Sequence, residues 1–341
     1  MNRAFALMGS VALALGAVAD ARAQTELTFS TWVPLTHPIS TYIFNPWFEQ
    51  VEKDSGGTVK FRTLPKPIAA PNQHYDAVSK GQVDITYSTY GYQPERFMPY
   101  LVAELPQLGE TAVHNGVALW RIHKKYYEKL ALHQDVYLIG LMTHGPGLMH
   151  HAKKPVMVPD DLKGQKIRVG TDVSRLIVNH FGGVVITQPA PKSYEILSQG
   201  IADGIFFPME SVKSFNIAKI VTHTTYVKGG LYSSGFWFAM NKEKFNSLPQ
   251  KAKDAIVKNG GEAFARHGGK GWDRADAEGL ALAKDNKNTV QEASPEFVAK
   301  LNELTKRIEA DYSAQLDKMG LPGKQVIADY RAELEKVKAG N

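Results

Sequence analysis

The chain has 341 residues, of which 43% are hydrophobic and 22% charged, ordinary values for a globular protein long enough to form two domains. It contains no cysteine, which excludes disulfides, thiolate nucleophiles and zinc or iron–sulfur sites built on cysteine. The formal net charge is +6, but Lys and Arg are dispersed among acidic residues instead of clustered with aromatic ones, so we expect no nucleic-acid partner.

The N-terminus has the pattern of a secretory signal peptide. Arg3 precedes an apolar run from Ala4 to Ala19, and Ala21-Arg22-Ala23 is a small-x-small cleavage signature. The apolar run is shorter than the ~20 residues that a bilayer core requires, which argues against a membrane anchor. We therefore expect residues 1–23 to be removed and the mature protein to be soluble.

The first part of the mature chain alternates short β-rich runs with amphipathic stretches. This alternation is typical of βαβ units and predicts an α/β fold. The predicted strands are 27–31, 59–64, 85–88 and 136–141, and the predicted helices are 46–53 and 74–80.

The middle of the chain repeats the alternation around one arginine, Arg168. Residues 161–169 predict a turn and a short strand, and further strands are predicted at Val184–Thr187 and Gly204–Phe207 with helices between them. In the first of these strands Arg168 alternates with Ile167 and Val169, so its side chain should point away from the face that they bury. Such a position is suited to hold an anion.

The last third of the chain is mostly helical after a strand at Ser233–Met240. A helical pattern runs from 249 to 285, with expected interruptions at Gly260-Gly261 and Gly268-Gly269. A second helical block runs from 295 to 338, with a break at 320–323.

The order and spacing of these pieces resemble the solute-binding proteins of TRAP transporters, the DctP-type receptors that deliver organic acids to a sodium-driven permease. Further motifs keep the same order over roughly 300 residues, which chance matches do not usually do. They are Trp32-Val33-Pro34-Leu35-Thr36-His37-Pro38, Ser55-Gly56-Gly57-Thr58-Val59, Tyr75-Asp76-Ala77-Val78, Gly81-Gln82-Val83-Asp84-Ile85, Glu104-Leu105-Pro106, Tyr194-Glu195-Ile196-Leu197, Gly200-Ile201-Ala202-Asp203-Gly204, and Met240-Asn241 followed by Leu248-Pro249.

The resemblance implies a two-lobed periplasmic binding protein fold with discontinuous lobes, a ligand cleft between them and a long helix that spans both. It places residues 24–143 with 231–272 in lobe I, and 144–230 with 273–341 in lobe II. It also implies a periplasmic location and TRAP membrane permease subunits as partners. We expect a monomer without a cofactor, although some relatives bind a 2-oxo acid through a metal ion or form dimers.

In the family the arginine of the strand that corresponds to Lys166-Ile167-Arg168-Val169 forms a salt bridge with the substrate carboxylate, and here that position is Arg168. The cleft differs from that of dicarboxylate and sugar-acid receptors, because Phe207 stands where those commonly carry an Asn. The second arginine of sialic-acid receptors has no counterpart in residues 143–148. We therefore predict one bound carboxylate with an aromatic or bulky hydrophobic body, whose burial at about 25 cal/mol per Å² supplies a few kcal/mol.

Other residues are candidates for the cleft wall. Phe206 and Phe207 are adjacent in a strand and face opposite ways, so Phe207 is assigned to the cleft and Phe206 to the core. Loops or strand ends near the expected cleft carry Trp32, Tyr90, Tyr92 and Tyr232. His144 is a candidate hydrogen-bond donor to a carboxylate or hydroxyl. The adjacent pair His150-His151 is not assigned to a metal, since no third ligand is suitably spaced.

Two alternatives remain open at the level of sequence. Within the receptor class, the ligand is a small aliphatic 2-oxo or hydroxy acid or a C4-dicarboxylate. In a different class, the chain is a cofactor-independent periplasmic enzyme that uses scattered carboxylates such as Glu104, Asp203 and Glu210. Nucleophile-elbow, P-loop, His-Glu-x-x-His and dinucleotide-binding motifs are all absent from the sequence.

Overall fold

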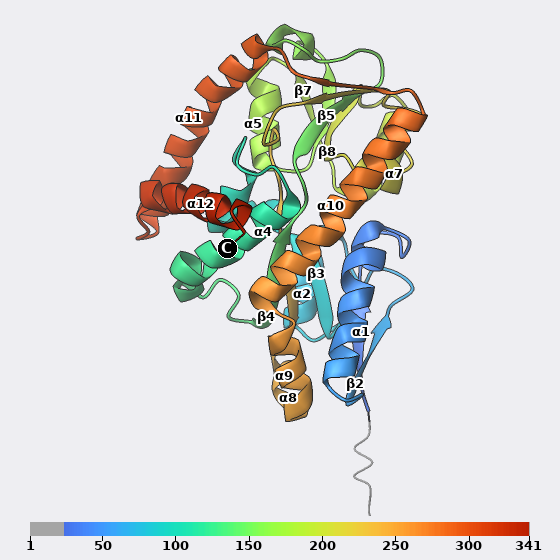
Figure 1. Ribbon diagram of the computed structural model, residues 1–341, viewed down its shortest axis with the longest axis vertical. Coiled ribbons are helices and arrows are strands. Elements are labelled where there is room, and N and C mark those ends of the chain that lie inside the picture. The colour runs from blue at the N-terminus through green and yellow to red at the C-terminus, as the bar shows by residue number, and fades with distance from the viewer. Residues whose placement is uncertain (1–23, 341) are drawn as a thin grey trace, which may run out of the picture.

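The structure is a computed structural model that describes residues 24–340. The predicted signal peptide, residues 1–23, lies outside the described residues. Within them, two mixed β-sheets are flanked by helices, and no helix is long and apolar enough to cross a membrane (Figure 1).

The first sheet has the strand order β2-β1-β3-β10-β4. Strand β1 is parallel to β2 and β3, whereas β10 is antiparallel to both of its neighbours, β3 and β4. The strands are β1 (Thr25–Ser30), β2 (Val59–Thr63), β3 (Ile85–Thr89), β4 (Val136–Thr143) and β10 (Gly235–Asn241). These segments match the runs of β-branched and aromatic residues in the sequence.

The second sheet has the strand order β11-β9-β5-β8-β6-β7. Strand β6 is parallel to β7 and β8, with Arg168 paired to Ile186 on one side and Ile205 on the other. The strands are β5 (Gly147–His151), β6 (Lys166–Val169), β7 (Val184–Thr187), β8 (Gly204–Pro208), β9 (His223–Tyr226) and β11 (Thr289–Glu292).

The chain passes between the two sheets more than once. It leaves the first sheet after β4, builds most of the second, returns at β10, and reaches the second sheet again at β11 along helix α10 (Gly261–Asp285). The predicted α/β class with two discontinuous lobes is therefore confirmed. The lobe boundaries stay a prediction, because α12 (Gly323–Lys338) packs against α4 (Ala112–Ile122) beside the first sheet.

Helices flank both sheets, with α5 (Asp172–His180) and α7 (Ser211–Ser214) beside the second sheet and α1 (Asn45–Asp54) beside the first (Figure 1). The long helix α10 runs diagonally across the molecule, from the end of the first sheet near β4 to α7 beside the second sheet (Figure 1). The remaining helices are α2 (His74–Ser79), α3 (Pro94–Phe97), α6 (Ser193–Ser198), α8 (Lys242–Ser247), α9 (Gln250–Lys258) and α11 (Pro295–Lys318).

One expectation about the helices is wrong. The chain does break at Gly260-Gly261, where Gly261 has φ +58°, but it stays helical through Gly268-Gly269. A Cβ on Gly269 would lie 2.5 Å from Cα of Val113, and one on Gly268 would lie 2.9 Å from Sδ of Met142. These glycines therefore allow α10 to approach α4 and β4 closely, and they do not end the helix.

We expect Gly269→Ala to destabilise the protein by about 1–3 kcal/mol, because the new methyl group meets backbone atoms that cannot rotate away. In a helix with free space the same change would stabilise by about 0.5–1 kcal/mol, so the sign is diagnostic. Chemical denaturation measures it, with Gly268→Ala as the matched variant, since its contact is a flexible methionine and its loss should be smaller. A higher unfolding free energy for Gly269→Ala would contradict the close approach.

Candidate functional site

A narrow cavity of about 50 Å³ lies between the two sheets. Both sheets and α10 contribute to its wall, which consists of Trp32, Val33, His37, Ile39, Thr89, Tyr92, His144, Arg168, Gly170, Thr171, Ala190, Phe207, Pro208, Glu210, Ser211, Phe215, Tyr232, Ser234, Phe236 and Trp272.

Arg168 is the cation of this cavity. Its neighbours in β6, Ile167 and Val169, are buried in the core on the other face of the strand, as the alternation predicts. The arginine itself is 1% exposed, its Nε donates to the carbonyl of Gln188 at 2.9 Å, and its guanidinium lies over the ring of Phe207, 4.5 Å from the ring centroid. Within residues 24–340 it forms no ion pair with a carboxylate.

The surroundings of Arg168 are consistent with a site for an anion. Burial lowers the pKa of its guanidinium from the ordinary value, and the nearby hydroxyls of Tyr92 and Tyr232 partly offset this effect. A guanidinium remains protonated in proteins, so the buried positive charge persists. A Cβ on Gly170 would lie 2.9 Å from Nη2 of Arg168, so this glycine lets the backbone pass close to the charge.

Most of the remaining wall is aromatic. Phe207 stacks on Phe215 with ring centroids 5.2 Å apart, and Phe236 stacks on Trp272 at 5.7 Å. Trp32 meets Tyr92 edge to face at 5.9 Å. Offset and edge-to-face packing of this kind is favourable for aromatic rings.

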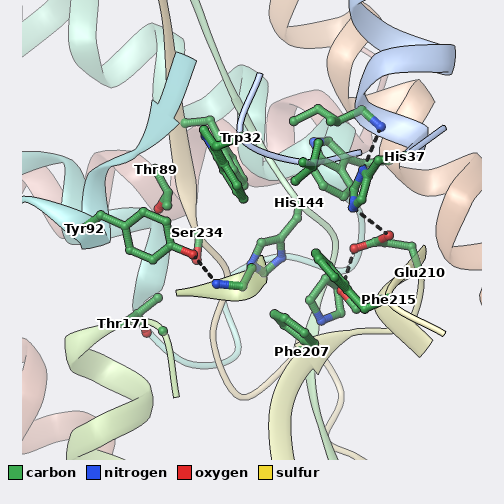
Figure 2. Close-up of a pocket in the computed structure, with 18 of the residues that line it drawn as sticks. Trp32, His37, Thr89, Tyr92, His144, Thr171, Phe207, Glu210, Phe215 and Ser234 are labelled. Carbon is green, nitrogen blue, oxygen red and sulfur yellow. Dashed lines mark hydrogen bonds and ion pairs between the residues drawn. The ribbon is translucent and has the colours of Figure 1, made fainter. Parts of the chain in front are cut away.

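The polar atoms of three aromatic wall residues are already engaged with the backbone. The Tyr232 hydroxyl donates to the carbonyl of Phe206 at 3.0 Å, and Trp32 Nε1 donates to the carbonyl of Tyr87 at 3.3 Å. The Tyr92 hydroxyl accepts from the N–H of Ala190 at 2.9 Å, which joins the first sheet to the second (Figure 2). These side chains therefore present mainly their rings to the cavity.

His144 lies near the centre of the cavity in Figure 2. Its Nδ1 donates to the carbonyl of Gly145 at 2.6 Å, and burial lowers its pKa to about 4. The ring is therefore neutral at neutral pH, with Nε2 as an acceptor. The ligand role of His144 stays a prediction, and with its one proton on Nδ1 the Nε2 atom is available to a ligand as an acceptor and not as a donor.

A second polar group, formed by His37 and Glu210, lies away from Arg168. Nε2 of His37 lies 3.7 Å from Oε2 of Glu210, and both side chains are 2% exposed. The Glu210 carboxylate accepts hydrogen bonds from Ser211 and Ser214, each at 2.5 Å. Burial raises the pKa of Glu210 to about 7 and lowers that of His37 to about 3.

Of the six residues that the sequence assigned to ligand binding, five line the cavity. These are Arg168, Phe207, Trp32, His144 and Tyr232. The structure does not bring Tyr90 to the wall, because its ring stacks on Tyr100 at 4.1 Å in the core and its hydroxyl pairs with His133. The chain turns after Tyr90, so Tyr92 reaches the cavity instead.

The three carboxylates of the enzyme alternative are not gathered at the cavity. Only Glu210 lines it, whereas Glu104 is fully buried behind Gly91, outside the wall, and Asp203 accepts from the N–H of Lys166 at 2.9 Å. Sequence reasoning assigned no ligand role to His37, Phe215, Phe236 or Trp272. The sequence analysis included His37 only as part of the motif after β1. Nothing local in the sequence distinguishes Phe215, Phe236 and Trp272 from core residues.

Comparison with solved structures gives close matches to receptors of TRAP transporters. A solute-binding protein from Bordetella bronchiseptica, with bound (R)- and (S)-mandelate, is 36% identical with a TM-score of 0.89, covering 92% of this chain and 99% of that one. One from Rhodoferax ferrireducens, with copurified benzoate, is 27% identical with a TM-score of 0.87, covering 93% and 100%. One from a marine metagenome, with 3-hydroxybenzoate, is 29% identical with a TM-score of 0.86, covering 92% and 98%.

The family model for bacterial extracellular solute-binding protein, family 7 (DctP), matches residues 29–315. This range includes both sheets except for the first four residues of β1, and every residue of the cavity wall. The match and the folds of the similar structures agree with the order of motifs along the chain. The chain therefore belongs to the DctP family of TRAP-transporter solute-binding proteins.

Proposed function

We propose that this protein captures an aromatic monocarboxylate in the cavity between its lobes and delivers it to a TRAP membrane permease. The observation that carries the proposal is Arg168, a buried guanidinium at the cavity wall that has no carboxylate partner among residues 24–340. A buried charge without a counter-ion is unfavourable by several kcal/mol, and a ligand carboxylate supplies the missing partner.

The aromatic wall supports a ring as the body of the ligand. Phe207 contacts both the guanidinium and the Phe215 ring, and the stacked pair Phe236–Trp272 adds a second aromatic surface. The wall contains one cation, Arg168, and one carboxyl group, Glu210. A second ligand carboxylate would therefore lose its hydration without meeting a second cation, which argues against the dicarboxylate alternative.

The similar structures support the same class of ligand. Mandelate, benzoate and 3-hydroxybenzoate are each an aromatic ring with one carboxylate, and they are bound by relatives that are 27–36% identical to this chain. An export signal at residues 1–23 and a periplasmic site of action follow from the family and the sequence pattern. We infer that the protein is a receptor and not an enzyme, since its family and similar structures are solute-binding receptors.

We expect benzoate, phenylacetate and mandelate to raise the melting temperature more than succinate or malate do. The reason is that Arg168 neutralises one carboxylate, while the aromatic wall stabilises a ring and not a second charge. A ligand at ~100 times its dissociation constant adds ~2.7 kcal/mol to the unfolding free energy. A thermal-shift series on the cleaved protein measures this, and a largest shift with a C4-dicarboxylate would refute the ligand class.

We expect Arg168→Lys and Arg168→Ala to weaken aromatic-acid binding by about 30-fold to several thousand-fold, the equivalent of ~2–5 kcal/mol. Lysine should not rescue binding, because an ammonium is a point charge without the planar fork of a guanidinium. The unliganded variants should melt no lower than wild type, since the change removes a buried charge that lacks a protein counter-ion.

Calorimetry with the acid and with its primary amide tests this anchor. The amide should bind wild type as poorly as the acid binds Arg168→Ala. The matched control is Arg175→Lys, because Arg175 lies one turn into α5, pairs with Asp172 and is absent from the cavity wall. Near-wild-type affinity of either Arg168 variant for the acid would remove Arg168 as the carboxylate anchor.

We also expect ligand binding to close the lobes. The cavity wall is formed from both sheets, so a ligand makes contacts from both sides together only in the closed state, which it therefore favours. Small-angle scattering should show a smaller radius of gyration at saturating aromatic acid. Arg168→Ala at the same ligand concentration is the control, and an unchanged radius for wild type would contradict closure.

A further inference from the structure

The end of the cavity away from Arg168 carries a polar pair that the anchoring of a carboxylate does not use. Figure 2 shows Tyr92 and Thr171 on one side of the cavity and His37, Glu210 and Phe215 on the other. The contacts agree with this order. Arg168 lies 4.5 Å from the Phe207 ring, Phe207 stacks on Phe215 at 5.2 Å, and Phe215 meets the His37 ring at 5.3 Å.

His37 offers a donor whose direction is set by the backbone. Its Nδ1 accepts from the N–H of Ile39 at 3.1 Å, so the proton of the neutral imidazole is on Nε2. Burial lowers the pKa of His37 to about 3, which keeps the ring neutral at neutral pH. The Nε2 atom lies 3.7 Å from Glu210 Oε2, too far for a direct hydrogen bond, so this donor is available.

Glu210 offers an acceptor that is equally well held. The hydroxyls of Ser211 and Ser214 each donate to one of its oxygens, and its backbone N–H donates to Asp276 at 2.8 Å. Each carboxylate oxygen can accept more than one hydrogen bond, so Oε2 retains acceptor capacity. No lysine or arginine of residues 24–340 forms an ion pair with Glu210.

A hydroxyl group is the substituent that matches this pair, because it accepts one hydrogen bond and donates another. An oxygen placed beside the 3.7 Å gap can lie about 2.8 Å from both Nε2 of His37 and Oε2 of Glu210. A carboxylate in the same place would face Glu210, whose backbone is bonded to a further carboxylate, Asp276, without a cation. A methyl or methoxy group would leave at least one of the two buried polar atoms without a partner.

We propose that His37 and Glu210 form a second recognition point, which binds a hydroxyl group on the aromatic ring of the ligand and excludes a second carboxylate. The two residues belong to different lobes, His37 after β1 of the first sheet and Glu210 after β8 of the second. A hydroxyl between them therefore also bridges the lobes. This inference rests on the proposed function, since it assumes an aromatic acid held at its other end by Arg168.

The test compares phenylacetate with its 2-, 3- and 4-hydroxy isomers and with the methoxy analogue of the tightest isomer, all by calorimetry on wild-type protein. At least one hydroxy isomer should bind about ten-fold or more tightly than phenylacetate, and its methoxy analogue should lose that gain. This arm needs no variant, so it decides the proposal even if a substitution impairs folding. Equal affinities for phenylacetate and all three isomers would overturn it.

Substitutions of His37 and Glu210 then test whether these two residues cause the preference for a hydroxyl group. Glu210→Leu and His37→Phe should each remove most of the hydroxyl gain, measured as the ratio of the affinities for the hydroxy isomer and for phenylacetate within the same variant. Glu195→Leu, the same change of charge on the exposed face of α6, is the matched control and should retain the gain. A hydroxyl preference that persists in both pair variants would overturn the assignment to His37 and Glu210.

These outcomes are distinct from a failure of the proposed function. If no aromatic acid binds, or if Arg168→Ala binds phenylacetate as wild type does, the carboxylate anchor is wrong and both proposals fall. If phenylacetate binds through Arg168 but hydroxylation brings no gain, only the second recognition point is wrong.

Discussion

The structure of the binding site depends on a positive charge that is buried without a protein counter-ion. Arg168 is held in place by the carbonyl of Gln188, the ring of Phe207 and the close passage of Gly170, none of which neutralises it. Moving a charge out of water is unfavourable unless the charge is paired. The favourable free energy of folding of the rest of the protein must therefore exceed the cost of burying Arg168. A ligand carboxylate that pairs with Arg168 offsets this unfavourable free energy. Ligand binding is therefore coupled to the burial of the site.

The two ends of the cavity differ in the charge they accept. At one end the guanidinium favours an anion, and at the other the neutral imidazole of His37 and the carboxyl group of Glu210 favour a group that exchanges hydrogen bonds. The aromatic rings between them favour a flat apolar body. Specificity arises as much from what the Glu210 end rejects as from what Arg168 attracts, because a second carboxylate would be desolvated beside another carboxyl group.

The same geometry links recognition to movement. Residues from both sheets and from α10 form one wall, and the Tyr92 hydroxyl reaches across to the backbone of Ala190. A ligand that touches both lobes stabilises their closed arrangement by the contacts that the open one lacks. Gly269 permits close packing of α10 on α4, which holds the first half of this long helix beside the first sheet. The second half of α10 approaches the second sheet.

The sequence by itself determined eight of the eleven strands of residues 24–340, the limits of α1, α2, α11 and α12, and the position of Arg168, because alternation and turn residues act over a few residues along the chain, whereas β5, β9, β11 and α4 were not predicted. It also placed Phe207 opposite Phe206, since a strand alternates its faces. Only the tertiary structure decided that Tyr92 and not Tyr90 reaches the cavity, and that Gly268-Gly269 permits helix packing instead of a break. It likewise brought His37, Glu210 and Trp272 together from three distant segments. Such contacts depend on how sheets and helices pack in space, and no local pattern in the sequence records that packing.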